Sequence, residues 1–331
     1  MLRNPTDFDK RRAAGCAIYR FALLTPDMPI HDALKRLIIE FDETERPDRQ
    51  VRARGQMSFG AALEGPPGRL HGGHHAFVRT LPIVERITAH EDARTFPCSV
   101  DVTMKQSLPL ERAIEFEASY RSDGASWWLD TRFEGTDRLV AHAHSIPNQP
   151  LVDHAEMAGW RSLYEDSVPG DDSFEMFGFT MHLAEKLAWI ECRDPSRTLP
   201  DSQHAALVEP GDTLGPAFVA TQLDAVGATS RGALMRHPQF TTHIEIQFAM
   251  RSFPAETHLL CLADRTRMED DPSSEIAPVE INGVLYRTVT TPVALVDAAF
   301  ERAFATGRVT VHPVDPAKFA ALRKMRQIRN D

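Results

Sequence analysis

The sequence predicts an α+β fold made of two tandem copies of one unit, in each of which an antiparallel sheet wraps around a buried helix. Two observations lead to this prediction. Three separate segments of the first half recur about 144–145 residues later in the chain. Both copies then show the same order of helix-like and strand-like hydrophobic patterns.

The repeat has three anchors. The segment LHGGHHAFVRT, which begins at Leu70, corresponds to LGPAFVATQLD, which begins at Leu214. The segment SLPLE from Ser107 corresponds to SFPAE from Ser252, and DRLVAHAHSIP, which ends at Pro147, corresponds to NGVLYRTVTTP. Each match is weak alone, but a nearly constant offset at three places is difficult to obtain by chance. We therefore expect a duplication.

Each copy begins with a helical segment, at residues 70–90 in the first copy and 214–234 in the second. Apolar residues are too dense in both segments for a one-sided amphipathic helix, so each helix should be mostly buried. A strand with alternating apolar residues follows each helix. Its inward residues are Val100, Val102 and Met104 in the first copy and Ile244, Ile246 and Phe248 in the second.

The first copy continues as a meander of strands, with turns predicted at 122–124 and 135–137. One buried helix followed by an antiparallel meander is the hotdog arrangement. Hotdog units normally pair, because joining two short sheets edge to edge removes an exposed edge from each. A tandem repeat allows this pairing within one chain, and the sheets or helices also offer surfaces for a homodimer.

The expected organisation has four parts. They are an N-terminal hotdog unit with a leading helix (1–150), a helical linker (151–199), a C-terminal hotdog unit (200–300) and a C-terminal helical tail (301–331). The leading helix is expected at 29–43, where PIHDALKRLIIEFDE is amphipathic. The linker helix is expected within FEMFGFTMHLAEKLAWI, residues 174–190, and the tail helix from residue 316, where Lys and Arg suit a helix C-terminus.

Composition restricts the class of protein. An apolar share of 42% with 25% charged residues is typical of a soluble globular protein. No stretch approaches the ~18–20 uninterrupted apolar residues of a membrane span, and the N-terminus lacks the apolar core of a secretory signal, so we expect a cytoplasmic protein. A net charge of −10 argues against nucleic acid as a partner. The four Cys residues form no C-x-x-C pair, which favours buried, reduced thiols.

Several short motifs carry a family resemblance. They are Gly72-Gly73 at the head of the first helix, RSDGAS at 121–126, LDA at 223–225, Thr242 eight residues before MRSF, Glu256, and NGVLYRTV in the closing hairpin. With these motifs, residues 60–298 resemble the double-hotdog acyl-CoA thioesterases of the type II (TesB-like) group. The resemblance implies two hotdog units and hydrolysis of an acyl thioester.

The resemblance also implies a set of catalytic residues. In that family the helix of the second copy carries an Asp, its next strand a Thr and its last strand a Gln, and together they orient a water molecule. Asp224 and Thr242 match the first two positions. At the third position this chain has Thr291, or alternatively Thr290, and a hydroxyl has a shorter reach and a different donor set than a Gln amide.

The residues can also be read without the resemblance. Thioester hydrolysis needs a group that orients water, donors for the developing oxyanion and an apolar slot for the acyl chain. Asp224 lies on a buried helix and can orient water; alternatively, it caps or pairs with another group. The first copy has Thr80 at the equivalent position, so we expect at most one acid-type site. Thr242 can assist Asp224, or else Thr241 and Thr242 are ordinary β-branched strand residues.

His71-Gly72-Gly73 marks the start of the first helix. Its unsatisfied N–H groups suit a thioester carbonyl, and Gly215 marks the equivalent start in the second copy. Alternatively, the glycines only provide a tight helix entry. His71, His74 and His75 suggest a metal, but no carboxylate or thiol completes a ligand set nearby, so neither a metal nor another cofactor is predicted.

Three functions follow as hypotheses. The first is a thioesterase acting on an acyl-CoA or another acyl thioester, with Asp224, Thr242 and Thr291 at the reaction centre and His71, Gly72, Gly73 and Gly215 binding the substrate. The second is a hotdog hydratase or dehydratase of acyl-CoA with His71 as its base, although the usual paired Asp and His in a Gly-rich loop is not visible. The third is a non-catalytic protein that binds acyl thioesters.

Overall fold

The computed structural model describes most of the chain. The described residues are 10–13, 16–22, 34–44, 49–65, 68–88, 95–104, 107–133, 140–167, 173–176, 179–193, 207–209, 213–235, 238–271, 274–317 and 319–321. The helices are α2 (Gly72–Val78), α3 (Leu81–Ile87), α4 (His154–Glu165) and α7 (Pro216–Met235), with short 3-10 helices η1 (Ala61–Leu63) and η2 (Arg265–Arg267).

The strands fall into two groups along the chain. Those of the first half are β1 (Lys10–Ala13), β2 (Cys16–Ala22), β3 (Leu34–Thr44), β4 (Arg49–Phe59), β5 (Cys98–Thr103), β6 (Ile114–Ser122), β7 (Trp127–Phe133) and β8 (Val140–Ser145). Those of the second half are β9 (Phe174–Met176), β10 (Phe179–Leu183), β11 (Leu187–Cys192), β12 (Val208–Glu209), β13 (Thr213–Leu214), β14 (Gln239–Phe248), β15 (Phe253–Pro254), β16 (Leu259–Asp264), β17 (Glu269–Asp270), β18 (Val279–Ile281), β19 (Val284–Tyr286), β20 (Val289–Asp297) and β21 (Ala303–Pro313).

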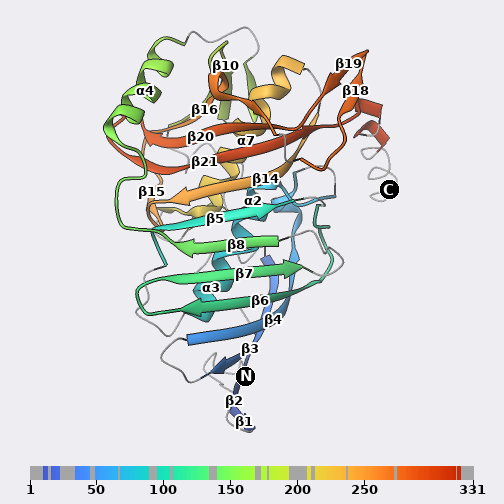
Figure 1. Cartoon of the computed structure of the whole chain (residues 1–331), viewed down its shortest axis with the longest axis vertical. Coiled ribbons are helices and arrows are strands. Elements are labelled where there is room, and N and C mark those ends of the chain that lie inside the picture. The colour runs from blue at the N-terminus through green and yellow to red at the C-terminus, as the bar shows by residue number, and fades with distance from the viewer. Residues whose placement is uncertain are drawn as a thin grey trace.

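One antiparallel sheet runs through the molecule, from β1 at one end to β9 at the other (Figure 1). Its order is β1-β2-β3-β4-β6-β7-β8-β5-β14-β21-β20-β16-β11-β10-β9. The strands from β4 to β5 form the sheet of the first unit, and those from β14 to β10 form the sheet of the second. β12, β13 and β15 form a small separate sheet, and β18 and β19 form a hairpin.

Each unit has a buried helical layer against its sheet. In the second unit this layer is the single long helix α7. In the first unit the predicted helix is divided into α2 and α3, because Thr80 departs from helical geometry and Pro82 has no N–H to continue the helical hydrogen bonds. Strand β6 alternates buried and exposed residues as expected for a sheet with one covered face, and its turn into β7 has Gly124 at a φ of +85°. The turn predicted at 135–137 lies outside the described residues.

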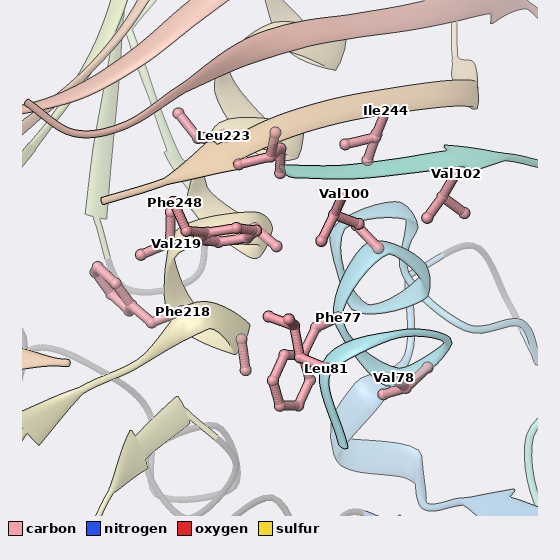
Figure 2. Close-up of a cluster of buried hydrophobic side chains, with 14 of the residues drawn as sticks. Phe77, Val78, Leu81, Val100, Val102, Phe218, Val219, Leu223, Ile244 and Phe248 are labelled. Carbon is pink, nitrogen blue, oxygen red and sulfur yellow. The ribbon is translucent and has the colours of Figure 1, made fainter. Parts of the chain in front are cut away.

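The two units meet edge to edge at β5 and β14. These strands pair from Thr103 opposite His243 to Cys98 opposite Phe248. Beneath the junction, α2 and α7 lie next to each other and contribute to one continuous core, whose side chains include Phe77, Val100, Leu223, Ile244 and Phe248 (Figure 2). The predicted tandem hotdog fold is therefore confirmed, and the inward positions predicted for β5 and β14 are buried.

Two predicted helices and one predicted boundary are wrong. Within 29–43 the described residues 34–43 belong to β3, which pairs with β2 and β4; the short apolar run LIIEF fits a strand as well as a helix. Residues 174–190 contain β9, β10 and most of β11 in place of a linker helix. The boundary of the tail at 301 is wrong, because residues 303–313 form the 11-residue strand β21 of the second sheet. The tail helix predicted from residue 316 does begin there, and residues 322–331 lie outside the described chain.

Burial on both faces explains the wrong assignment at β11. Ala188 and Ile190 face α7 in the main core, whereas Leu187 and Trp189 belong to a second apolar cluster on the opposite face, under α4. A strand covered on both sides has a continuous apolar run, which periodicity alone does not distinguish from a buried helix. Among the described residues, no helix is long and apolar enough to cross a membrane.

Candidate active site

The helices α2 and α7 approach each other very closely at Gly73. A Cβ atom at Gly73 would lie 2.3 Å from the carbonyl oxygen of Ala220 and 2.7 Å from the Cα of Thr221, both in α7. Backbone atoms cannot rotate away from such a clash, so only glycine fits this position. The predicted Gly72-Gly73 pair therefore serves the contact between the two units as well as the entry into α2.

Asp224 lies at this contact. It is 3% exposed, and its carboxylate points from α7 of the second unit onto the start of α2 in the first. The Gly73 N–H donates to Oδ2 at 2.9 Å, and the Thr241 hydroxyl donates to Oδ1 at 2.6 Å. Both carboxylate oxygens are thus held by donors from different elements, and this site exists only because the units are joined.

His71 is the third group at the carboxylate. Its ring is the N-cap of α2, with Nδ1 3.1 Å from the Gly73 nitrogen and 3.3 Å from Oδ2 of Asp224. Burial lowers the pKa of His71, and the nearby charge of Asp224 opposes that shift. With the proton on Nδ1, His71 donates to the carboxylate; with the proton on Nε2, Nδ1 accepts from Gly73.

Gly72 leaves space for the carboxylate. A Cβ at Gly72 would lie 2.5 Å from Oδ2 of Asp224 and 2.8 Å from the hydroxyl oxygen of Thr241. Any other residue would push these side chains away from their present positions. Gly72 and Gly73 consequently have different roles, since the first accommodates the polar side chains and the second accommodates the α7 backbone.

Thr242, predicted beside Asp224, lies elsewhere. A β-bulge between Thr241 and His243 reverses the alternation of β14, so that Thr241 faces Asp224. The hydroxyl of Thr242 donates to the carbonyl of Thr310 on β21 at 3.2 Å. Counting back by twos from Ile244 selects the wrong threonine, because a bulge is not visible in the alternation of apolar residues.

The structure also separates Thr291 and Gly215 from Asp224. The Thr291 hydroxyl lies 3.4 Å from that of Ser230, which is six residues after Asp224 and so about 9 Å farther along α7. The other candidate for the third position, Thr290, bonds Thr310. Gly215 precedes α7, about 13 Å from Asp224 along the helix axis. Of the predicted residues, the structure therefore brings together Asp224, His71, Gly72 and Gly73.

The corresponding position in the first unit holds no acid. The hydroxyl of Thr80 donates to the carbonyl of Ala76, one turn earlier in α2, at 2.7 Å. The two units thus differ chemically at the equivalent place, as the sequence predicts. A groove on the outer face of the second sheet, lined by Trp160, Arg267 and Arg308 among others, contains none of the predicted residues.

The other histidines of α2 are buried with their own contacts. His74 Nδ1 lies 3.3 Å from the Thr221 hydroxyl of α7, and its ring packs edge-on against that of His71. His75 Nε2 accepts from the Leu108 N–H at 3.4 Å. Among the residues that the structure describes, no three His, Cys, Asp or Glu side chains are placed to hold a metal ion.

Comparisons with known proteins find similarity in structure. No family model and no curated protein matches the sequence. A Thermobifida fusca protein assigned as a thioesterase II is 10% identical, covering 88% of this chain and 100% of that one with a TM-score of 0.49. The tesB protein of Mycobacterium avium subs paratuberculosis is 14% identical over 80% of this chain and 93% of its own, with a TM-score of 0.45.

A dehydratase is similar to the same extent. The dehydratase domain of the polyketide PpsC from Mycobacterium tuberculosis is 11% identical over 80% of this chain and 93% of its own, with a TM-score of 0.46. At such low identities and TM-scores, these structures do not distinguish one reaction from another. The function proposed below rests on the residues of this chain.

Proposed function

We propose that this chain is an acyl thioesterase in which Asp224 orients and activates the attacking water. The observation that carries the proposal is the buried Asp224 carboxylate, held by Gly73 and Thr241 between helices of the two units. A carboxylate in a dry, fixed position is suited to general-base catalysis, because it keeps the water in a reactive orientation. The substrate is an acyl-CoA or another acyl thioester.

The reaction follows from this arrangement. Asp224 takes a proton from water while the water oxygen attacks the thioester carbonyl, which gives a tetrahedral oxyanion. The oxyanion collapses, the carbon–sulfur bond breaks, and the proton returns from Asp224 to the leaving thiolate, so that water and thioester yield a carboxylic acid and a thiol. We assign the carbonyl to the Gly72 N–H, which at the first position of α2 has no partner within its helix.

Thr241 and Gly73 act as positioning groups in this proposal. They donate to different oxygens of Asp224 and so fix the plane of the carboxylate. Because the Gly73 N–H is used in this way, it is not an oxyanion donor. Thr242 and Thr291, which bond elsewhere, have no part in the mechanism.

A hydratase or dehydratase is the second candidate, and one observation favours it. His71 and Asp224 form a buried pair at 3.3 Å on facing helices, and such a pair can move a proton to and from carbon and oxygen. In that reaction water would add to the double bond of an enoyl thioester, and the carbon–sulfur bond would remain.

The two functions differ in their products. Free thiol is measured with a panel of saturated acyl-CoAs, and loss of the enoyl absorbance with the matching enoyl-CoAs, for the native chain and for Asp224→Asn. We expect thiol release that Asp224→Asn lowers at least a hundredfold, since a lost catalytic base costs about 10²–10⁴ in rate. Hydration without thiol release selects the second candidate. Binding without either reaction indicates a non-catalytic protein and contradicts both.

A further inference from the structure

Helix α2 carries a second group of buried polar side chains, beyond the Asp224 site. His75 and Arg79 are four residues apart and therefore lie on the same side of the helix. His75 is 2% exposed and Arg79 is completely buried. Burial is the main cause that lowers the pKa of His75 well below its usual value, and the neighbouring charge of Arg79 lowers it further. The His75 ring is therefore neutral at pH 7.

Arg79 has one half of its guanidinium anchored and the other half unused. Nη1 donates to the carbonyl of Thr103 at 3.1 Å, and the group lies 5.1 Å from the centre of the Phe133 ring. Nε and Nη2 have no hydrogen-bond partner in the described part of the chain. These two nitrogens form one edge of the guanidinium, which is suited to bind both oxygens of a carboxylate.

His75 adds a third donor. Its Nε2 accepts from the Leu108 N–H, so the proton of the neutral ring is on Nδ1. This Nδ1–H also has no hydrogen-bond partner among the described residues. Unsatisfied buried donors on two neighbouring side chains are rare in folded proteins and call for a ligand that accepts from both.

Electrostatics points to an anionic ligand. Burial lowers the pKa of Arg79 to about 9, which leaves the side chain cationic at neutral pH. No Asp or Glu in the described residues forms an ion pair with it. A buried cation without a counterion is costly, and an anion that binds with good geometry removes that cost.

We propose that Arg79 and His75 bind a carboxylate at the far end of the acyl group, so that the substrates are thioesters of dicarboxylic acids. This inference rests on the proposed thioesterase function and names its substrate class. Arg79 lies about 9 Å beyond Gly73 along α2, and Gly73 contacts Asp224. A chain of several carbon atoms then separates the thioester at Asp224 from the carboxylate at Arg79. Asp224 repels the carboxylate end, which fixes the direction of binding.

The first experiment compares substrates of equal length. The kcat/KM of thiol release is measured for CoA thioesters that end in a methyl group or in a carboxylate. We expect the native chain to prefer the carboxylate at least tenfold, as a charge-assisted pair of hydrogen bonds provides. Arg79→Met should abolish the preference, and Arg79→Lys should retain part of it. Arg121→Met is the control, because Arg121 stacks on Trp128 at the exposed surface and should leave the preference unchanged.

A second experiment needs no catalysis. The melting temperature is measured with pentanoate, hexanoate and octanoate, with the neutral primary amides of equal length, and with inorganic phosphate. Stabilisation by a carboxylate that Arg79→Met eliminates supports the carboxylate site, even where no thiol is released and the thioesterase proposal fails. Thiol release without preference for the carboxylate, or equal stabilisation by the neutral amides or by phosphate, overturns the inference and leaves the thioesterase standing. An Arg79→Met protein that melts well below the native chain and shows unchanged preference assigns Arg79 a purely structural role, which also overturns it.

Discussion

The contact between α2 and α7 leads to a quantitative prediction for Gly73→Ala. The added Cβ would lie 2.3 Å from the Ala220 carbonyl oxygen, and an ordinary contact is about 3.5 Å, so the helices must separate by roughly 1 Å. Overpacking of this kind costs about 1–3 kcal/mol. The better helix propensity of Ala returns at most about 1 kcal/mol. Because the obstacle is backbone that cannot rotate away, we expect a net loss of about 2 kcal/mol.

Gly159→Ala is the matched control. Gly159 is in helix α4, and a Cβ added there would meet no atom within 4 Å. At this position only the higher helix propensity of Ala relative to Gly acts, so we expect the free energy of unfolding to rise by up to about 1 kcal/mol. The free energy of unfolding is measured in guanidinium chloride for both variants. If Gly73→Ala is as stable as Gly159→Ala, the close contact of the two helices is refuted.

Three further predictions concern other parts of the molecule. The His243–Asp101 pair at 2.8 Å joins the sheets of the two units, and its hydrogen bond raises the pKa of His243. Burial acts to raise the pKa of Asp101, but the hydrogen bond and the charge of His243 outweigh burial and lower that pKa. The stabilisation should therefore decrease as the pH rises through the raised pKa of His243, and again as it falls through the lowered pKa of Asp101, and His243→Gln should remove both dependences of the melting temperature. Gln222 is fully buried with neither amide atom hydrogen-bonded to a described residue, so Gln222→Leu should increase the free energy of unfolding by about 1 kcal/mol; a loss of stability would indicate that the amide is satisfied. Burial raises the pKa of the thiols of Cys98, Cys192 and Cys261. In a Cys16→Ser variant, Ellman's reagent should therefore react with these three thiols only after the protein has been unfolded.

The architecture could be predicted because the repeat and the alternation of apolar residues are local signals. The spacing of Val100 and Val102, repeated at Ile244 and Ile246, indicates the two strands that join the units. The segment at 187–192 resembles a helix in sequence because packing on both faces removes that alternation. Local patterns therefore predict elements that have one covered face, and they fail where tertiary contacts cover both.

In the candidate site, too, local sequence identifies some residues, whereas the contacts between them depend on tertiary packing. Asp224 could be chosen from its place on an apolar helix, and Gly72 and Gly73 from their place before another. That these residues, about 150 positions apart, meet at one carboxylate depends on the packing of α7 against α2, which no short segment encodes. Thr241 could not be chosen because one extra residue in β14 changes which threonine faces inward. Arg79 could not be chosen because its burial is visible only in three dimensions.

The most direct test of the central claim, a catalytic Asp224 oriented across the two units, compares Thr241→Val with Thr242→Val. The two residues are adjacent on β14, and each loses one hydroxyl, but only Thr241 donates to Asp224. The kcat/KM of thiol release is measured for both variants, with the melting temperature as a check on folding. We expect Thr241→Val to lower kcat/KM about tenfold or more, as the loss of a hydrogen bond to a charged group implies, and Thr242→Val to leave it within about twofold of the native value. Equal effects, or a larger effect at Thr242, would contradict the account.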